Sequence, residues 1–470
     1  MTGQSHAFHS SVLREYDIRG IVGETLSTND AAAIGRTFGT MLARKMSTKP
    51  KVCLGYDGRL TSPDMEEALC NGLTSAGVDV VRIGRGPTPM LYFAVYHLEA
   101  DGGIMVTGSH NPPSHNGFKM MMGHKSFFGE DIQTLGRMSS KGDIEVASEP
   151  GHASQTDVSE AWLDKLVSAC GGIEQLGNHK VAWDAGNGSG GEMMARLTER
   201  LPGDHILLNE EIDGTFPNHH PDPTVAENLE QIQEIVRNQG LDLGIALDGD
   251  ADRIGVVDGQ GRILWADQLM ALLARDVLAD NPGAPIIADV KSSQLFFDEV
   301  ARLGGRPIMW QTGHSLIKGK MAEEKAPFAG EMSGHIFFAD RYYGFDDALY
   351  AGVRLLGVLT RTGKSLADLF DELPTFVNTP EIRIECADDR KFDIVSEIRD
   401  RLVEEGAEVD DIDGVRVSVD GGWWLLRASN TQAVLVARCE AKDEALLKEL
   451  KSALGTVLAD SGIDATAIQG

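Results

Sequence analysis

The sequence predicts three similar α/β units with mixed, mostly parallel sheets, followed by a smaller α+β unit with an antiparallel sheet. Three observations lead to this prediction. Strands and helices alternate in an order that occurs three times along the chain. Each pass carries polar loops at matching places, directly after its strands. The last part of the chain departs from this order and carries a hairpin signal instead.

The composition is that of an ordinary globular protein with room for about three domains of ~150 residues. The chain has 470 residues, of which 42% are apolar and 24% are charged. Its formal net charge is −28 and it has no run of lysine or arginine, which argues against nucleic acid or a membrane as a partner. Its five cysteines include no C-x-x-C pair, and its N-terminus resembles no signal peptide. We therefore expect a cytoplasmic protein.

The first unit opens with a helix over residues 30–45, whose apolar side chains recur on one face. A strand over 51–56 and a helix over 62–77 follow, and this helix has proline at its first position. Strands over 78–83 and 103–106 complete the unit. Such β-α-β order predicts a mostly parallel sheet covered by helices.

The same order is expected twice more. In the second unit we predict strands over 180–184 and 243–247 and helices over 192–201 and 229–240. In the third unit we predict strands over 285–290, 307–311 and 327–329, a helix over 294–303 and a further helix before the last strand.

Polar loops follow the strands of each unit. The early strands end in GYDGR (55–59), WDAGNGSG (183–190) and ADVKSS (288–293), and the last strands end in TGSHNPP (107–113), DGDADR (248–253) and GEMSGH (330–335). Ligands of open α/β sheets bind beyond the carboxyl ends of the strands. The three units can therefore present these loops to one shared cleft.

The C-terminal unit differs from the other three. Pro374 and Pro380 bracket a predicted linker. The Asp420-Gly421 pair is a tight-turn signal between two short apolar runs, which predicts an antiparallel hairpin. The remaining predicted elements are a strand over 433–436 and helices over 390–402 and 442–458, with the loop RASNTQ (427–432) between two strands.

TGSHNPP places Ser109 where an apolar strand ends, with Gly108 to let the backbone turn. Pro112 and Pro113 stop regular structure directly afterwards. A serine displayed in this way can act as a nucleophile or carry a phosphate. The alternative interpretation of this motif alone is a polar loop with an Asn-Pro turn.

DGDADR sets Asp248, Asp250 and Asp252 at alternate positions, with Arg253 beside them. Three carboxylates this close repel each other unless a cation joins them. Oxygen ligands suit magnesium or calcium rather than zinc. An EF-hand would need glycine where Arg253 stands and glutamate where Gly259 stands, so that interpretation fails.

Two further loops are weak signals when taken alone. GEMSGH offers Glu331, Ser333 and His335 on a strand-like segment, and carboxylate and hydroxyl groups suit sugar hydroxyls. RASNTQ combines Arg427 with short polar side chains, a set that suits a phosphate dianion but is also common turn material.

The GNGSGG loop supports a rival hypothesis. Gly186, Gly188 and Gly191 fit G-x-G-x-x-G between a strand and a helix, and Glu211 lies twenty residues beyond, as in a dinucleotide-binding fingerprint. That pattern would indicate a nicotinamide-dependent oxidoreductase, but it leaves the other polar loops without a role. A sugar-phosphate-binding protein without catalysis would explain the pocket but not a serine beside a metal site.

Together, the loops TGSHNPP, DGDADR, GEMSGH and RASNTQ resemble those of the α-D-phosphohexomutase superfamily, in particular its bacterial phosphomannomutase/phosphoglucomutase branch. The resemblance covers nearly the whole chain and implies four domains around a central cleft, at residues 1–153, 154–262, 263–373 and 374–470. It implies an enzyme that interconverts hexose 1-phosphate and hexose 6-phosphate, with mannose and also glucose as the sugar. Phosphoglucosamine mutases usually carry other residues in the GEMSGH loop, and such a mutase is the alternative within the superfamily.

The resemblance also implies roles for individual residues. Ser109 would carry the phosphate and, with Asp248, Asp250 and Asp252, bind Mg²⁺. The residues that would line the cleft are Tyr16, Arg19, Lys119, Arg253, Lys291 and His314. Glu331 and Ser333 would hold sugar hydroxyls, with His335 nearby. The non-reacting phosphate would be bound by Arg427, Ser429, Asn430 and Thr431.

The expected chemistry needs a general base to take the proton from the sugar hydroxyl and return it later. The candidates are Lys119, His110, His314 and His335, and the sequence does not rank them. The intermediate and activator would be a hexose 1,6-bisphosphate. We expect small hexose phosphates as the binding partners and a monomer or weak dimer as the assembly.

Overall fold

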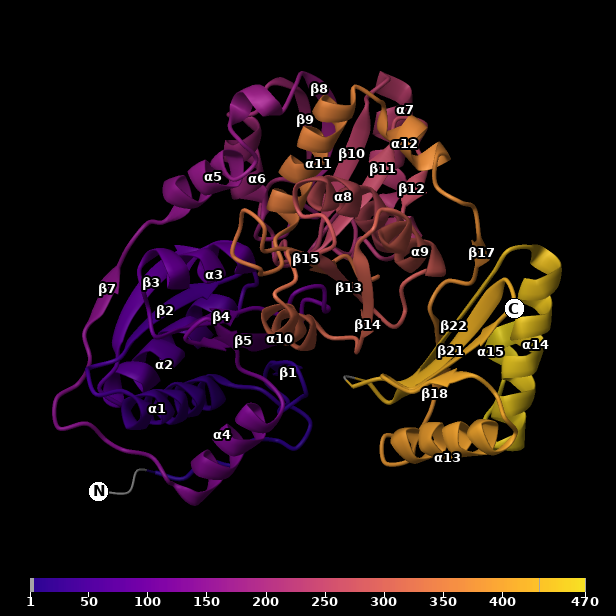
Figure 1. The fold of residues 1–470 in the computed structure, drawn as a ribbon. Coiled ribbons are helices and arrows are strands. Elements are labelled where there is room, and N and C mark those ends of the chain that lie inside the picture. The colour runs from indigo at the N-terminus through magenta and orange to yellow at the C-terminus, as the bar shows by residue number, and fades with distance from the viewer. Residues whose placement is uncertain (1–3, 431, 470) are drawn as a thin grey trace.

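The computed structural model describes residues 4–430 and 432–469. It contains four sheets, which define four domains along the chain (Figure 1). Three α/β domains lie side by side, and the fourth, at the C-terminus, stands beside the third. This arrangement confirms the predicted fold class of three α/β domains and a C-terminal α+β domain.

Domain I is built on a seven-stranded sheet with the order β1-β5-β4-β2-β3-β7, with β6 paired to β5. Its strands are β1 (Ile18–Ile21), β2 (Lys51–Tyr56), β3 (Asp79–Arg85), β4 (Gly102–Val106), β5 (His115–Met122), β6 (Lys125–Ser126) and β7 (Ala153–Gln155). Its helices are α1 (Thr28–Lys45), α2 (Ser62–Ser75), α3 (Thr88–His97) and α4 (Glu130–Lys141). The serine loop follows the central parallel strand β4 and returns as the antiparallel strand β5.

Domain II has a five-stranded sheet with the order β12-β11-β10-β8-β9. Its strands are β8 (His179–Asp184), β9 (Gly203–Leu208), β10 (Leu243–Leu247), β11 (Ile254–Asp258) and β12 (Ile263–Leu264). Its helices are α5 (Ser159–Ser168), α6 (Gly191–Thr198) and α7 (Glu230–Gln239), with short 3₁₀ turns at Ile173–Gln175 and Ala226–Leu229. The aspartate loop joins β10 to the antiparallel strand β11.

Domain III has a four-stranded sheet with the order β14-β13-β15-β16. Its strands are β13 (Pro285–Asp289), β14 (Arg306–Trp310), β15 (Phe328–Gly330) and β16 (Ile336–Phe338), and its helices are α8 (Ala266–Asp280), α9 (Gln294–Arg302), α10 (His314–Glu324), α11 (Ala348–Thr362) and α12 (Leu366–Asp371). The segment between β15 and β16 is a turn, in which Gly334 N donates to Glu331 O at 3.0 Å. The expectation of a strand-like segment at GEMSGH was therefore wrong, because the chain must reverse there to pair β15 with β16.

Domain IV is an antiparallel sheet with the order β17-β22-β21-β20-β19, with β18 paired to β22. Its strands are β17 (Val377–Asn378), β18 (Ile382–Glu385), β19 (Val409–Asp410), β20 (Val415–Val419), β21 (Gly422–Ala428) and β22 (Val434–Ala441), and its helices are α13 (Lys391–Glu404), α14 (Glu444–Asp460) and α15 (Thr466–Gln469). The predicted hairpin is present, with Val419 opposite Gly422.

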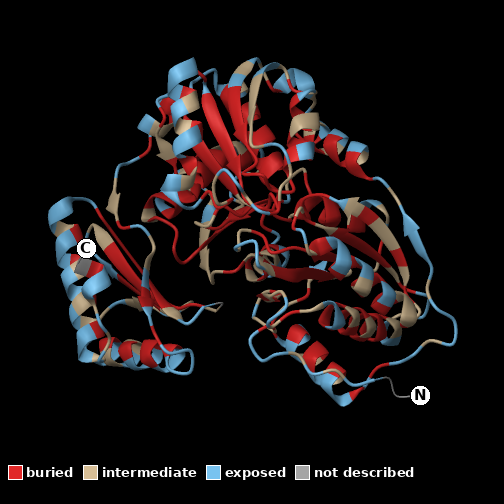
Figure 2. Ribbon diagram, turned by 180° about the vertical axis from the view of Figure 1, so that it is seen from behind, coloured by how far each residue is buried: buried red, intermediate tan, exposed pale blue. Residues whose placement is uncertain are grey.

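The apolar cores show how the domains are joined. One continuous buried cluster runs through domains I, II and III, from Met90 through Trp183 to Phe296 (Figure 2). Domain IV has a core of its own, around Trp424 and Leu454. Among the described residues, a small apolar cluster that includes Val290 and Trp423 links this core to domain III. The first three domains therefore pack as one body, and the fourth is a separate unit.

Two short strands lie across the predicted domain boundaries. Strand β7 crosses the predicted boundary after residue 153 and pairs with β3 of domain I. Strand β12 lies just beyond the predicted boundary after residue 262 and pairs with β11 of domain II. Edge strands of two or three residues are too short to show a periodicity, so no sequence pattern indicates them.

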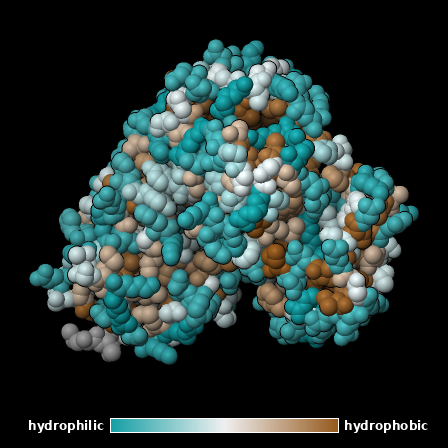
Figure 3. All heavy atoms as spheres, in the orientation of Figure 1, coloured by the Kyte–Doolittle hydropathy of each residue, from teal (hydrophilic) through white to brown (hydrophobic). Residues whose placement is uncertain are grey.

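The surface is mostly hydrophilic and is hollowed between domains I and IV (Figure 3). Within residues 4–430 and 432–469, we find no helix with the length and hydrophobicity needed to cross a membrane.

Candidate active site

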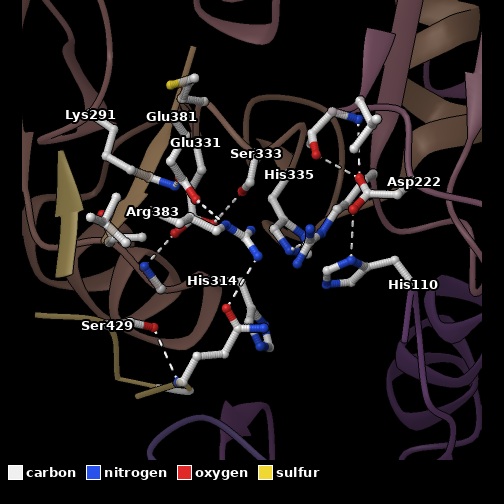
Figure 4. A pocket seen from close by; sticks show the side chains of 18 of the residues that line it. His110, Asp222, Lys291, His314, Glu331, Ser333, His335, Glu381, Arg383 and Ser429 are labelled. Atoms are coloured by element: carbon white, nitrogen blue, oxygen red, sulfur yellow. Dashed lines mark hydrogen bonds and ion pairs between the residues drawn. The ribbon is translucent and has the colours of Figure 1, made fainter. Parts of the chain in front are cut away.

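A cavity of about 820 Å³ lies where the four domains meet. The predicted residues that line it are Tyr16, Arg19, Ser109, His110, Lys119, Arg253, Lys291, His314, Glu331, Ser333, His335, Arg427, Ser429 and Asn430. Figure 4 shows His110 and Asp222 facing each other on one side of this pocket, and Lys291, Glu381 and Ser429 on the other. Thr431 lies outside the described residues. Loops that are hundreds of residues apart in the sequence thus share one cleft.

Ser109 is held in a backbone conformation that serine rarely adopts, with a φ of 48°. The Arg59 guanidinium fixes its loop by donating to the carbonyl oxygens of four loop residues, Ser109, Asn111, Pro112 and His115. Asp57 accepts a hydrogen bond from Gly108 N at 3.1 Å and from Arg59 N at 3.0 Å. The loop is therefore preorganised, and these contacts support its strained turn.

The aspartate loop of domain II approaches the serine loop closely. A Cβ atom at Gly249 would lie 2.3 Å from Ser109 O, so only glycine fits there. Ser109 Oγ donates to Asp248 Oδ2 at 2.8 Å, which places the hydroxyl directly beside the three carboxylates.

Asp248, Asp250 and Asp252 are fully buried, and one oxygen from each lies within 4.8 Å of the other two. Asp250 Oδ1 and Asp252 Oδ1 have no hydrogen-bond partner among the described residues. Burial and the two neighbouring aspartates raise the pKa of Asp248 well above its usual range. Buried carboxylate oxygens that carry negative charge and lack hydrogen-bond partners are the ligands that a hard divalent cation prefers.

Lys119 also contacts this cluster. Its Nζ donates to Asp250 Oδ2 at 2.7 Å and to Asp252 Oδ2. Burial opposes its charged form, but the three aspartates together raise its pKa above the ordinary value for lysine. One ammonium group thus offsets part of the negative charge of the aspartates.

The sugar-loop residues face the cleft from domain III. Glu331 accepts hydrogen bonds from Gly313 N and, at 3.0 Å, from Ser333 Oγ. His335 Nε2 accepts from Arg253 Nε at 3.0 Å, and its Nδ1 lies 2.9 Å from Asp346 Oδ2. The loops of domains II and III are therefore connected by side chains at the cleft.

His110 is paired on the domain II side of the cleft. Its Nδ1 lies 2.9 Å from Asp222 Oδ2. Burial and the charge of Arg253 lower the pKa of His110 to about 4. The imidazole is therefore neutral near pH 7, with its orientation fixed by the Asp222 carboxylate.

The cationic side chains at the domain IV end are held by carboxylates. Arg427 Nε donates to Asp413 Oδ2 at 2.9 Å, and Lys291 Nζ to Glu381 Oε2 at 3.2 Å. The charge of Lys291 lowers the pKa of Glu381 to about 2. These two cations are thus fixed in place at the edge of the cleft.

Tyr16 joins three domains at the mouth of the cleft. Its hydroxyl donates to Thr312 O of domain III at 2.6 Å and is contacted by Asn430 Nδ2 of domain IV. Arg19 lies nearby and donates to Asn111 Oδ1 of the serine loop at 2.9 Å.

The sequence interpretation missed several residues of the site. These are Asp57, Arg59, Asp222, Asp346, Glu381, Arg383 and Asp413. GYDGR was noted as a polar loop, but nothing in it showed that Arg59 would span the serine loop. The other available signals were the two histidines beside Asp222 in HHPDPT (219–224) and the two adjacent aspartates in GFDDA (344–348).

The GNGSGG loop offers no room for a dinucleotide. Residues 181–191 are all buried. A Cβ atom would lie 2.8 Å from Gly249 O at Gly188 and 2.1 Å from Glu210 O at Gly191. These glycines allow the loop to pack against its neighbours, including the aspartate loop, so the oxidoreductase hypothesis was wrong.

Comparison with known families gives four matches along the chain. They are described as the phosphoglucomutase/phosphomannomutase alpha/beta/alpha domains I, II and III, at residues 10–138, 160–261 and 265–376, and the C-terminal domain, at residues 381–455. Their order is the order of the four sheets.

Individual relatives agree with these matches. The phosphomannomutase/phosphoglucomutase of Pseudomonas aeruginosa is 43% identical over 453 residues, which cover 96% of each chain. A phosphoglucomutase of Neisseria gonorrhoeae is 42% identical over 449 residues, covering 95% of this chain and 96% of that one. The crystal structure of a phosphoglucomutase/phosphomannomutase family protein from Burkholderia thailandensis superposes with a TM-score of 0.90 at 40% identity, covering 97% of this chain and 98% of that chain.

Proposed function

The chain belongs to the phosphoglucomutase/phosphomannomutase family, and on that premise we propose that it interconverts the 1-phosphates and 6-phosphates of mannose and glucose. In this reaction Ser109 carries a phosphoryl group, gives it to the sugar phosphate to form a hexose 1,6-bisphosphate, and takes back the other phosphate. The observation that carries the proposal is the position of Ser109 Oγ, 2.8 Å from Asp248 Oδ2 in a cleft lined by lysine, arginine and histidine.

Asp248, Asp250 and Asp252 would hold the metal ion, which we propose is Mg²⁺, with the Ser109 phosphate as a further ligand. The buried Oδ1 atoms of Asp250 and Asp252, which have no hydrogen-bond partner among the described residues, support this assignment. When bound, the ion would offset negative charge on the transferring phosphoryl group. Arg253, whose Nε is 3.0 Å from His335 Nε2, would stabilise the same charge from the sugar side.

The remaining cleft residues would hold the substrate. Glu331 and Ser333 would bind sugar hydroxyls, while Tyr16, Arg19 and Lys291 line the path between the two phosphate positions. Arg427, Ser429, Asn430 and Thr431 would bind the phosphate that does not react, since a guanidinium with short polar donors suits a dianion. The bisphosphate must turn end over end between the two transfers, so both phosphate positions need cations.

The general base is one of Lys119, His110, His314 and His335. Lys119 donates to two aspartates, His110 is held by Asp222, and His335 accepts from Arg253. His314 stacks on His335, with 5.2 Å between the ring centroids. Each candidate therefore has a fixed position at the cleft. Because the pKa of Lys119 is raised, this lysine would have to lose its own proton before it could receive that of the hydroxyl.

We further propose that the enzyme works in the cytoplasm as a monomer or weak dimer, with hexose 1,6-bisphosphate as its activator and no nucleic acid or membrane partner. The net charge of −28 and the scattered cysteines support this setting.

A coupled assay with mannose 1-phosphate, glucose 1-phosphate and glucosamine 1-phosphate tests the activity. We expect turnover of the first two substrates.

Peptide mass spectrometry of active enzyme should find phosphate on Ser109, and Ser109→Ala should abolish turnover. Ser114→Ala, which changes an exposed serine of the same loop, is the matched control and should remain active. Normal turnover by Ser109→Ala, or activity on glucosamine 1-phosphate alone, would contradict the proposal.

A further inference from the structure

A second group of metal-ligating atoms lies beside the serine loop, apart from the three aspartates. One ligand atom each from His110, His220 and Asp222 lies within 4.8 Å of the other two. His110 belongs to domain I, whereas His220 and Asp222 belong to domain II. Both imidazoles are partly exposed and the carboxylate is buried. The group therefore spans the interface of two domains at a place that solvent reaches.

The segment that supplies His220 and Asp222 is held by local hydrogen bonds. Asp222 N donates to His220 O at 2.8 Å, across Pro221, which closes a tight turn and brings the two side chains together. Asp222 Oδ1 accepts from Thr224 N at 3.1 Å and from Thr224 Oγ1 at 2.6 Å. Those bonds leave Asp222 Oδ2 facing His110. The adjacent His219 is engaged elsewhere, because its Nε2 lies 2.9 Å from Asp184 Oδ2.

We infer that His110, His220 and Asp222 form a second metal site, which takes a borderline transition-metal ion such as Zn²⁺. Two imidazoles and one carboxylate are a donor set that zinc prefers, whereas the oxygen-only set of the three aspartates suits magnesium. Three protein ligands leave one position open for water or a phosphate oxygen. His110 and Asp222 both line the main cavity, so an ion that they held would be accessible from the cleft.

An ion at this site would act on the neighbouring serine loop. Pro221 Cγ lies 3.4 Å from the position of a Cβ at Gly249, and the same position is 2.3 Å from Ser109 O. The HHPDPT segment thus packs against the aspartate loop, and the aspartate loop packs against the serine loop. Zn²⁺ bound to His110 would prevent this imidazole from contacting the substrate, and it would link domains I and II. We therefore expect zinc to inhibit turnover in a way that additional Mg²⁺ does not relieve.

Direct metal binding tests the site independently of the proposed mutase activity. Chelator-treated protein is kept in excess Mg²⁺, to fill the aspartate site, and titrated with Zn²⁺ by calorimetry and with Co²⁺ by visible absorbance. We expect one Zn²⁺ per chain, with Co²⁺ showing the intense band of a four-coordinate site. His220→Ala should weaken the binding of both Zn²⁺ and Co²⁺ by more than about 10-fold. Loss of a residue that only hydrogen-bonds to a metal ligand already lowers metal affinity by that factor. It should keep its activity in Mg²⁺ alone.

Two controls separate this site from its alternatives. His219→Gln changes the neighbouring imidazole and should bind Zn²⁺ as the unaltered chain does. Asp248→Asn removes an oxygen ligand of the other site and should also bind it unchanged. Circular dichroism and the melting temperature check that His220→Ala is folded, and His220→Gln serves if it is not. Equal Zn²⁺ binding by a folded His220 variant, loss of binding in Asp248→Asn, or no binding at all would overturn the inference.

Discussion

At the scale of single residues, the groups that face the cleft are positioned by side chains that do not face it. Arg59 holds the serine loop through four carbonyl oxygens. Asp346 is fully buried and holds both His335, at 2.9 Å, and Lys318, at 3.0 Å. His335 in turn accepts from Arg253. The geometry of the reacting groups therefore depends on residues one step further from the substrate.

We predict that Asp346→Asn lowers kcat by about 10- to 100-fold, the cost typical of losing a residue that orients another functional group. KM should change less, because Asp346 orients Arg253 through His335 and does not contact the sugar. Steady-state kinetics with glucose 1-phosphate measures both. Asp340→Asn is the matched control, since Asp340 is a buried carboxylate of a nearby loop that pairs with Arg354 at 2.8 Å. Equal losses in the two variants would show a general structural effect instead.

A second residue-scale prediction concerns Glu331. Mannose and glucose differ only at C2, whereas the family resemblance implies that Glu331 holds the hydroxyls at C3 and C4. These hydroxyls roughly exchange places when the bisphosphate turns, so one rigid contact can serve both orientations. Glu331→Ala should therefore reduce kcat/KM for both 1-phosphates by a similar factor, of about 10-fold or more for its lost hydrogen bonds. Loss of one activity with the other intact would contradict this account.

At the scale of elements, the N-terminus of α11 depends on a buried carboxyl group. Asp347 accepts from Tyr350 N at 2.9 Å to cap the helix, and also from Tyr342 and from Trp162 of α5. Burial raises the pKa of Asp347 to about 7, from an ordinary value of 3.8. The folded protein therefore binds this proton more tightly than the unfolded chain does.

The sign of the pH dependence follows from that shift. The protonated carboxyl group of Asp347 makes its full contribution to the free energy of unfolding below pH 3.8, and this contribution is lost as the pH rises through about 7. Between those two pH values, the free energy of unfolding can fall by up to about 1.4 kcal/mol for each pH unit. We predict that Asp347→Asn, which cannot ionise, shows a flatter melting temperature between pH 5 and pH 8 than the unaltered chain. Parallel curves in differential scanning calorimetry would refute the pKa assignment.

The elements that the sequence predicted are those with a periodic or turn signal. Helices α1 and α2 and the β20–β21 hairpin have one, and the structure contains them. Helix α3 was missed because its sequence is apolar on all sides, which leaves no face to recognise. Strand β11 was missed because it directly follows the aspartate loop.

The candidate site was predictable only in part, for a related reason. Ser109 and the three aspartates lie in short motifs whose local chemistry is distinctive. Arg59, Asp222 and Asp346 act through contacts between segments, such as the bond from Arg59 to Asn111 O, 52 residues away. No local pattern reveals such a contact before the chain has folded.

At the scale of the whole molecule, domain IV contacts the other domains through hydrogen bonds and ion pairs as well as through the small apolar cluster that includes Val290 and Trp423. Arg416 Nη1 donates to Val290 O at 2.7 Å, and Arg438 Nη1 to Asp267 Oδ2 at 3.1 Å. Lys291 and Glu381 join the linker to domain III, and Asn430 contacts Tyr16 of domain I. Interfaces of this kind allow relative domain motion.

We predict that domain IV closes over the bound ligand, since its cations Arg427 and Arg383 face the cleft. Small-angle X-ray scattering should show a smaller radius of gyration with saturating hexose 1,6-bisphosphate. Glucose at the same concentration is the control and should leave the profile unchanged, because it offers no phosphate. An unchanged profile with the bisphosphate would count against closure.

The continuous core of domains I, II and III has a consequence for how the gene can be divided. Although their topologies repeat, these domains are not interchangeable modules, because each completes its interior with side chains from the others. A truncation after domain I or after domain II would leave a broad apolar surface in water and yield an aggregating fragment. Domain IV packs its interior apart from that shared core, so we expect it to fold when it is excised or transplanted.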